Sequence, residues 1–168
     1  METYDAVFAH GALHHVSQLD FLLGQIRERL VPEGMLYVND YVGPARFQWS
    51  DVQMRLANEL LQRVPRPYVV NMHVERCDPK SLARTDPSEA VCANFIVESV
   101  QAHFEIVCRV DRGGTLLAPI FGSGCLHPSI VETGEGLSVI EDLCAREHEL
   151  VRHAIIPSNH VVLIARRR

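Results

Sequence analysis

The chain has 168 residues, a formal net charge of −5 at pH 7, and 47% hydrophobic and 22% charged residues. This length and composition are typical of one globular domain with a hydrophobic core, and the acidic balance disfavours nucleic acid as a partner. No apolar run reaches the roughly 18 residues of a membrane span, and no signal peptide is predicted, so we expect neither a membrane partner nor export from the cytoplasm.

The N-terminal part of the sequence predicts a βαβ unit. Residues 4–10 have the β-propensity of a strand, and residues 18–30 repeat leucine and isoleucine with a helical period. Pro32 and Gly34 end that helix, and residues 35–42 form a second apolar strand. A strand, a crossover helix and a strand in this order predict two parallel strands.

Two helices are predicted next, over residues 51–64 and 88–102, and the second is expected to be capped by Asp86 or Ser88. The stretch between them has four prolines and no sustained period, which indicates irregular structure. We therefore expect residues 44–88 to be a helical and irregular insertion of the kind that forms a substrate lid.

The C-terminal part predicts a strand over 104–110, a short helix or buried loop within 115–130, a helix over 135–152 and a last strand over 160–165. With the strands above, this makes a sheet of about four strands. The fold class is α/β, and residues 1–168 are expected to form a single domain.

Two segments, YDAVFAHGALHHV and LDFLLGQIRERLVPEGMLYVNDYVGPARFQW, together resemble the C-terminal half of a class I S-adenosylmethionine-dependent methyltransferase. The resemblance makes residues 4–10 and 35–42 that family's fourth and fifth strands. It implies a partial Rossmann-like sheet in which residues 160–165 lie antiparallel between 35–42 and 104–110. In the family the Gly-rich cofactor loop precedes the fourth strand, so the resemblance implies a truncated chain that lacks this loop.

In that family the end of the fourth strand faces S-adenosylmethionine. The resemblance therefore implies cofactor contacts from four successive residues, Ala9, His10, Gly11 and Ala12. Glycine allows the backbone to approach a ligand closely. The alternative is that Gly11 only makes a turn.

Three residues are expected to be catalytic, namely His14, His15 and Asp40. Imidazole titrates in the range that is useful for a general base. Asp40 ends the second strand at the same sheet edge, where open α/β sheets bind ligands. The alternatives are that the histidines pack or cap the next helix, and that Asp40 only bonds the turn before Gly43.

No metal site is predicted. His10 and His14 have the spacing of two ligands on a helix, but Gly11 and the strand end interrupt that helix. The five cysteines are widely spaced without a C-x-x-C pair, which favours free thiols in a reducing cytoplasm over zinc or disulfides.

The expected function is S-adenosylmethionine-dependent methylation of a small-molecule acceptor, by an enzyme or by a truncated piece with impaired cofactor binding. The alternative is a non-catalytic methyltransferase-like module for binding or oligomerisation, because residues 4–10 lack the strand that pairs with them in the family. Such an exposed edge predicts a homodimer through this strand. A hydrolase or reductase is disfavoured, since the sequence has no nucleophile elbow and no dinucleotide fingerprint.

Overall fold

The computed structural model describes residues 2–167, which form two compact units. The sheet unit comprises residues 2–47, 79–112 and 159–167, and the helical unit comprises residues 48–78 and 113–158. The helical unit thus combines two separate parts of the chain, only one of which falls in the predicted insertion over residues 44–88. A lid function for that insertion stays a prediction.

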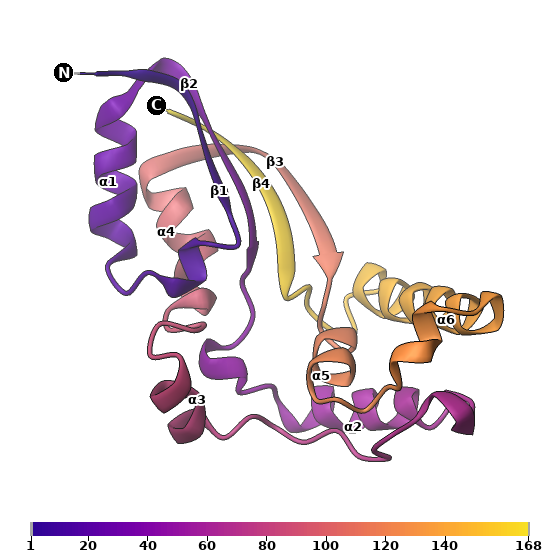
Figure 1. Cartoon of the computed structure of the whole chain (residues 1–168). Helices are drawn as coiled ribbons and strands as arrows, with labels where there is room; N and C mark the ends of the chain where they lie inside the picture. The colour runs from indigo at the N-terminus through magenta and orange to yellow at the C-terminus, as the bar shows by residue number, and fades with distance from the viewer. Residues whose placement is uncertain (1, 168) are drawn as a thin grey trace. The chain divides into compact units, whose positions relative to one another are not determined.

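The sheet unit is built on four strands with the order β1-β2-β4-β3. Their bounds are Tyr4–His10 for β1, Leu30–Tyr41 for β2, Phe104–Gly113 for β3 and His160–Arg167 for β4. β1 runs parallel to β2, with Val7 opposite Leu36, and β4 runs antiparallel to β2, with Val38 opposite Leu163 (Figure 1). The predicted α/β sheet, with its last strand antiparallel between the second and third strands, is confirmed.

The start of β2 differs from the prediction. The strand begins at Leu30 rather than Met35, because Leu30 already pairs with Tyr4 of β1. The next pairing joins Ala6 to Met35, so the residues between bulge out of register. Glu33 has a φ of 63° there, a conformation that lets the chain turn before regular pairing resumes.

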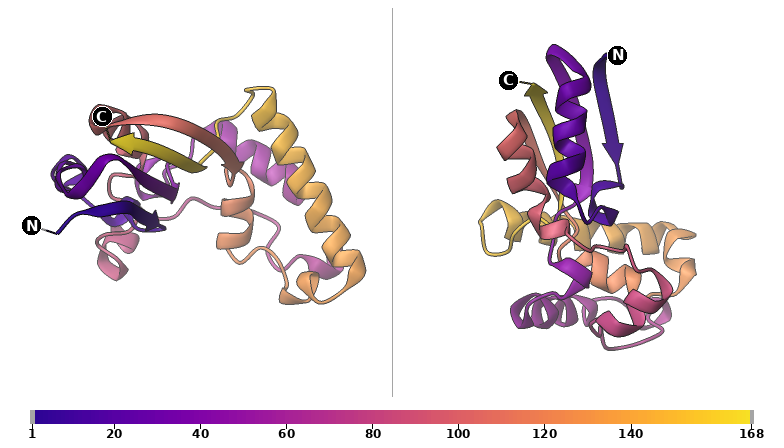
Figure 2. Two further views of the ribbon diagram at one scale, coloured as in Figure 1. Left: turned by 90° about the horizontal axis from the view of Figure 1, so that it is seen from above. Right: turned by 90° about the vertical axis from the view of Figure 1, so that its left-hand side faces the viewer.

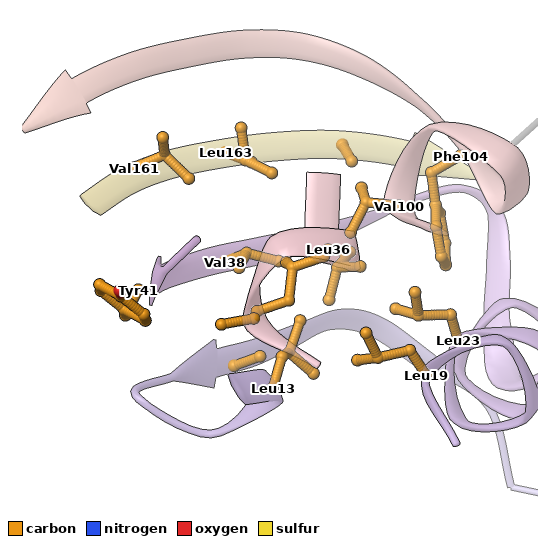
Figure 3. Close-up of a cluster of buried hydrophobic side chains, with 14 of the residues drawn as sticks. Leu13, Leu19, Leu23, Leu36, Val38, Tyr41, Val100, Phe104, Val161 and Leu163 are labelled. Atoms are coloured by element: carbon orange, nitrogen blue, oxygen red, sulfur yellow. The ribbon is translucent and has the colours of Figure 1, made fainter. Parts of the chain in front are cut away.

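Two helices, α1 (Leu19–Arg29) and α4 (Ile96–His103), lie on one face of this sheet (Figures 1 and 2). Their apolar side chains meet those of β2 and β4 in one buried cluster, shown in Figure 3. The fully buried members of this cluster are Leu23, Leu30, Leu36, Val38, Ala90, Ala93, Ile96, Val100, Phe104, Val161, Leu163 and Ala165. This core fixes the strand ends that carry the candidate site. The sheet unit also contains α3 (Pro79–Thr85).

The segment before α4 is a turn and not the predicted first turn of a helix. The side chain of Asp86 accepts hydrogen bonds from the backbone N–H groups of Ser88 and Glu89, which closes a local turn. Ala90 then has a φ of 49°, which no helix continues through. A short 3-10 turn, Ala93–Phe95, leads into α4. The predicted start of this helix at residue 88 was therefore wrong.

The helical unit contains α2 (Asp51–Leu61), α5 (Leu117–Gly122) and α6 (Gly134–Arg152). A capping box fixes the start of α2, because the Ser50 hydroxyl accepts the Gln53 N–H while the Gln53 side chain accepts the Ser50 N–H. The unit has its own apolar cluster, which includes Leu61, Val74, Leu116 and Ile120. Between residues 2 and 167, no helix combines the length and apolarity needed to cross a membrane.

A buried carboxylate holds the N-terminus of α5. Glu147 of α6 is 3% exposed, and its oxygens accept four backbone N–H groups, at 2.6–3.0 Å. The donors are Gly114, Thr115, Leu116 and Leu117. Gly113 has a φ of 78°, and a Cβ there would stand 2.4 Å from Glu147 Oε1, so the close approach requires glycine.

Candidate functional site

The candidate site lies where β1 and β2 end. The two strands are parallel, so their carboxyl ends meet at one edge of the sheet, as the sequence predicts. After His10 the chain turns at Gly11, whose φ is 55° and whose N–H donates to the Asn39 carbonyl at 2.9 Å. The chain then enters a 3-10 turn, Leu13–His15.

Asp40 organises this turn from the end of β2. The residue is 1% exposed. Its Oδ2 accepts the backbone N–H of Ala12 at 3.1 Å and of Leu13 at 2.8 Å, and its Oδ1 lies 2.5 Å from Nδ1 of His14. Burial disfavours the carboxylate, but the hydrogen bonds from His14 and from the backbone outweigh burial and lower the pKa of Asp40.

His14 is oriented by this carboxylate. The hydrogen bond to Asp40, acting against burial, raises the pKa of the imidazole. Because Oδ1 of Asp40 is an acceptor, Nδ1 of His14 carries the hydrogen. Nε2 of His14 lies 3.5 Å from Oε1 of Glu89.

His15 packs beside His14, with ring centroids 4.1 Å apart. Its Nε2 lies 3.8 Å from Oε2 of Glu89, and its Nδ1 lies 3.1 Å from the Ser88 hydroxyl. That hydroxyl in turn donates to the Asp86 carboxylate at 2.8 Å. A single carboxylate therefore faces both histidines.

Arg46 holds the segment that carries Glu89. Its guanidinium donates to the backbone carbonyls of Pro87 at 2.6 Å, of Glu89 at 2.9 Å and of Asp86 at 3.3 Å. The guanidinium carries several N–H donors in a fixed planar arrangement, so one side chain can bind three carbonyls of the same segment. The segment is also tied to the histidines, since the Val91 N–H donates to the His14 carbonyl at 3.0 Å.

The structure brings the three expected catalytic residues, His14, His15 and Asp40, together. Of the expected cofactor contacts, Ala9 has its side chain in the core, while His10 is exposed and lies 3.2 Å from the Asn39 amide. Gly11 and Ala12 form the turn beside them, and a Cβ at Gly11 would meet no atom within 4 Å.

Sequence reasoning missed Arg46, Ser88 and Glu89 as members of the site. Ser88 and His15 are 73 positions apart, so no spacing rule connects them. Asp86 and Ser88 read as helix caps because both residue types prefer that position. The available signal for a site was the group of polar residues that follows α3, namely Asp86, Ser88 and Glu89.

No family model and no curated protein sequence matches this chain. Among solved structures, it is similar to the [4+2]-cyclase SpnF, at 17% identity over 99% of this chain and 50% of that chain, with a TM-score of 0.43. It is similar to StiE O-MT at 14% identity over 99% of this chain and 44% of that one, with a TM-score of 0.41.

A third similar structure is Haemonchus contortus phosphoethanolamine N-methyltransferase 2 in complex with S-adenosyl-L-methionine, at 14% identity over 98% of this chain and 33% of that chain, with a TM-score of 0.44. The chain thus spans a third to a half of the length of these structures.

The fold assignment rests on the sheet itself. The order β1-β2-β4-β3, the parallel β1 and β2, and the antiparallel β4 between β2 and β3 are the arrangement that the sequence resemblance implies. Residues 2–167 therefore contain an α/β sheet that agrees with the partial Rossmann-like sheet expected from that resemblance.

Proposed function

We propose that this chain contributes one wall of the site of an S-adenosylmethionine-dependent methyltransferase that acts on a small-molecule acceptor. The observation that supports the proposal is the buried Asp40 carboxylate, which holds both the turn after β1 and the imidazole of His14. These groups lie at the carboxyl ends of parallel strands, which is where α/β sheets of this type bind ligands.

The turn at Gly11 fits the cofactor. The left-handed backbone and the open space where a Cβ would stand allow a flat ligand group to approach the chain closely. We assign the cofactor wall to His10, Gly11 and Ala12 together with the backbone of Ala9, whose side chain lies in the core. When bound, S-adenosylmethionine supplies a methyl group already activated by its sulfonium, so the protein has mainly to align the reactants.

His14 is the residue that we expect to contact the acceptor. Because Nδ1 is bonded to Asp40, Nε2 of the neutral imidazole carries the lone pair. This nitrogen can take the proton from the hydroxyl or amine group of the methyl acceptor. Asp40 is too buried to touch the acceptor, so it acts as a positioning residue that fixes the tautomer of His14. His15 flanks the same face.

A titration of the chain with S-adenosylmethionine, followed by amide chemical shifts, tests this proposal. Because the chain supplies one wall, we expect weak binding, with a Kd of about 1 mM, and shifts confined to residues 9–12. Gly11→Asn introduces a residue type that tolerates the positive φ of this position, while its side chain fills the open space. This variant should abolish the chemical-shift changes.

Gly122→Asn is the matched control. A Cβ at Gly122 also meets no atom within 4 Å, but this glycine lies in the helical unit. Shifts spread over the whole chain, or equal binding by both asparagine variants, would contradict the proposed wall. Binding in the micromolar range would instead rule out the alternative of a non-catalytic module.

We also propose that the chain self-associates through β1, which ends the strand order and is paired on one side by β2. Phe8 on this strand is 75% exposed. A lysine on an edge strand disfavours pairing with another chain, so Phe8→Lys should convert dimer to monomer in sedimentation velocity. Phe21→Lys on α1, which is 67% exposed, is the control and should leave the dimer intact. A wild-type chain that stays monomeric at high concentration would refute this assembly.

A further inference from the structure

We propose that His14, His15 and Glu89 form a binding site for a divalent transition-metal ion of the zinc class. Each residue offers one ligand atom, which is an imidazole nitrogen for each histidine and a carboxylate oxygen for the glutamate. These three atoms lie within 4.8 Å of one another. The proposal uses residues of the sheet unit alone and does not depend on methyl transfer. It differs from the His10–His14 pair considered in the sequence, because only His14 is shared.

The hydrogen-bond partners of the two histidines determine which nitrogen is free. Nδ1 of His14 donates to the Asp40 carboxylate. The Ser88 hydroxyl uses its hydrogen on Asp86, so it accepts from Nδ1 of His15. Both rings therefore carry their hydrogen on Nδ1, and both present a lone pair on Nε2 in the neutral state.

The two Nε2 atoms converge on the Glu89 carboxylate, at 3.5 Å for His14 and 3.8 Å for His15. Two lone pairs and a carboxylate are all acceptors, so the arrangement is favourable only when a cation or protons lie between them. An ion bound by these three atoms satisfies all of them at once. Two imidazoles and one carboxylate are a donor set that zinc-class ions prefer.

The surroundings of the ligands fit a metal centre. Asp40 supports the first histidine and Ser88 the second, which is how metal-binding imidazoles are commonly oriented by outer partners. Asp86 adds a further negative charge behind Ser88, while Arg46 directs its guanidinium to backbone carbonyls of the same segment. The site therefore has the charge that a divalent ion requires.

The ligands also have room to adjust. Zinc ligand atoms at about 2.1 Å from the ion are about 3.4 Å apart in a tetrahedron. The side chains of His15 and Glu89 are 35% and 22% exposed, so small rotations can close the remaining gap. Since the ion takes the Nε2 atom that we expect to contact a methyl acceptor, metal binding should suppress methyl transfer.

Calorimetric titration of the 168-residue chain with Zn²⁺, without S-adenosylmethionine or acceptor, tests the site. We expect one ion per chain in the wild type. Glu89→Gln and His15→Ala should abolish stoichiometric binding, and Ser88→Ala should weaken it by about 10-fold, as the loss of an outer partner does. Circular dichroism verifies that each variant is folded.

Two matched variants serve as controls. Glu98→Gln removes an exposed carboxylate from α4, and His148→Ala removes an exposed imidazole from α6, so both variants should bind zinc as the wild type does. Titration with Co²⁺ adds a spectroscopic readout, since ligation by nitrogen and oxygen gives visible bands without a thiolate-to-cobalt charge-transfer band.

Three results would overturn the metal site. These are equal zinc binding by Glu89→Gln and the wild type, a thiolate band that assigns the ion to cysteine, and the absence of stoichiometric binding by the wild type. In the last case, protons fill the space between the three residues. Because no cofactor is added, each of these results leaves the proposed methyltransferase function untouched, and a failed cofactor titration leaves the metal site untouched.

Discussion

Replacing Glu147 by alanine should lower the free energy of unfolding by about 3–5 kcal/mol, the usual cost of removing one partner from a buried charged network. Four backbone N–H groups at the start of α5 lose their acceptor in this variant. All four of these residues, Gly114 to Leu117, are buried or half-buried, so water replaces the lost carboxylate poorly.

Urea denaturation followed by tryptophan fluorescence measures this effect, because the single tryptophan, Trp49, is buried in the helical unit. Glu141→Ala on the exposed side of the same helix is the control, and its change should stay within about 0.5 kcal/mol. A loss below about 1 kcal/mol for Glu147→Ala would mean that the carboxylate does not hold α5.

Asp40→Ala should be about as destabilising, with a loss of about 3–5 kcal/mol in the free energy of unfolding. The alanine leaves the N–H groups of Ala12 and Leu13 and the Nδ1–H of His14 without their acceptor. Asp40→Asn keeps the size of the side chain but removes its charge. Nitrogen NMR of the imidazole should then show His14 as a mixture of tautomers, whereas the wild type holds its hydrogen on Nδ1.

The contribution of this pair should depend on pH in a defined direction. The pKa of Asp40 is lowered by folding, so its stabilising effect is present above its ordinary value of 3.8 and is lost as the pH falls through the folded pKa. The pKa of His14 is raised, so its effect is present below 6.5 and is lost as the pH rises through the folded pKa.

The stability difference between the wild type and Asp40→Asn should therefore be largest near about pH 5 and smaller near about pH 8. Urea denaturation at both values in the presence of a chelator measures it. A control with Asp20→Asn, an exposed aspartate on α1, should show a small difference at both values. A pH-independent difference for Asp40→Asn would contradict an ionised Asp40–His14 pair.

The strands and the helix between them could be predicted because short stretches of the sequence determine them. Residues 4–10 and 160–165 have the β-propensity of strands, and the helix between Leu19 and Arg29 repeats its apolar residues with a helical period. The strand order came from the family resemblance and not from periodicity. The end of β1 and the end of β2 follow from the parallel crossover, and this placed His14 and Asp40 at one edge.

The residues that the sequence did not reveal act across long separations. Glu147 lies on an amphipathic helix, where a glutamate normally faces solvent, and nothing nearby in the sequence marks it as buried. Glu89 follows a local turn closed by Asp86, which resembles a helix cap in sequence. Both carboxylates obtain their partners from segments more than 30 positions away, at Gly114 and at His14.

Three successive backbone N–H groups after β1, those of Gly11, Ala12 and Leu13, donate to acceptors on β2. In sequence this stretch is a connection, yet these three amides are hydrogen-bonded to the neighbouring strand. Its conformational entropy is therefore already lost in the ligand-free protein. A ligand that binds here meets a preorganised surface, so its affinity is not diminished by the ordering of a loop.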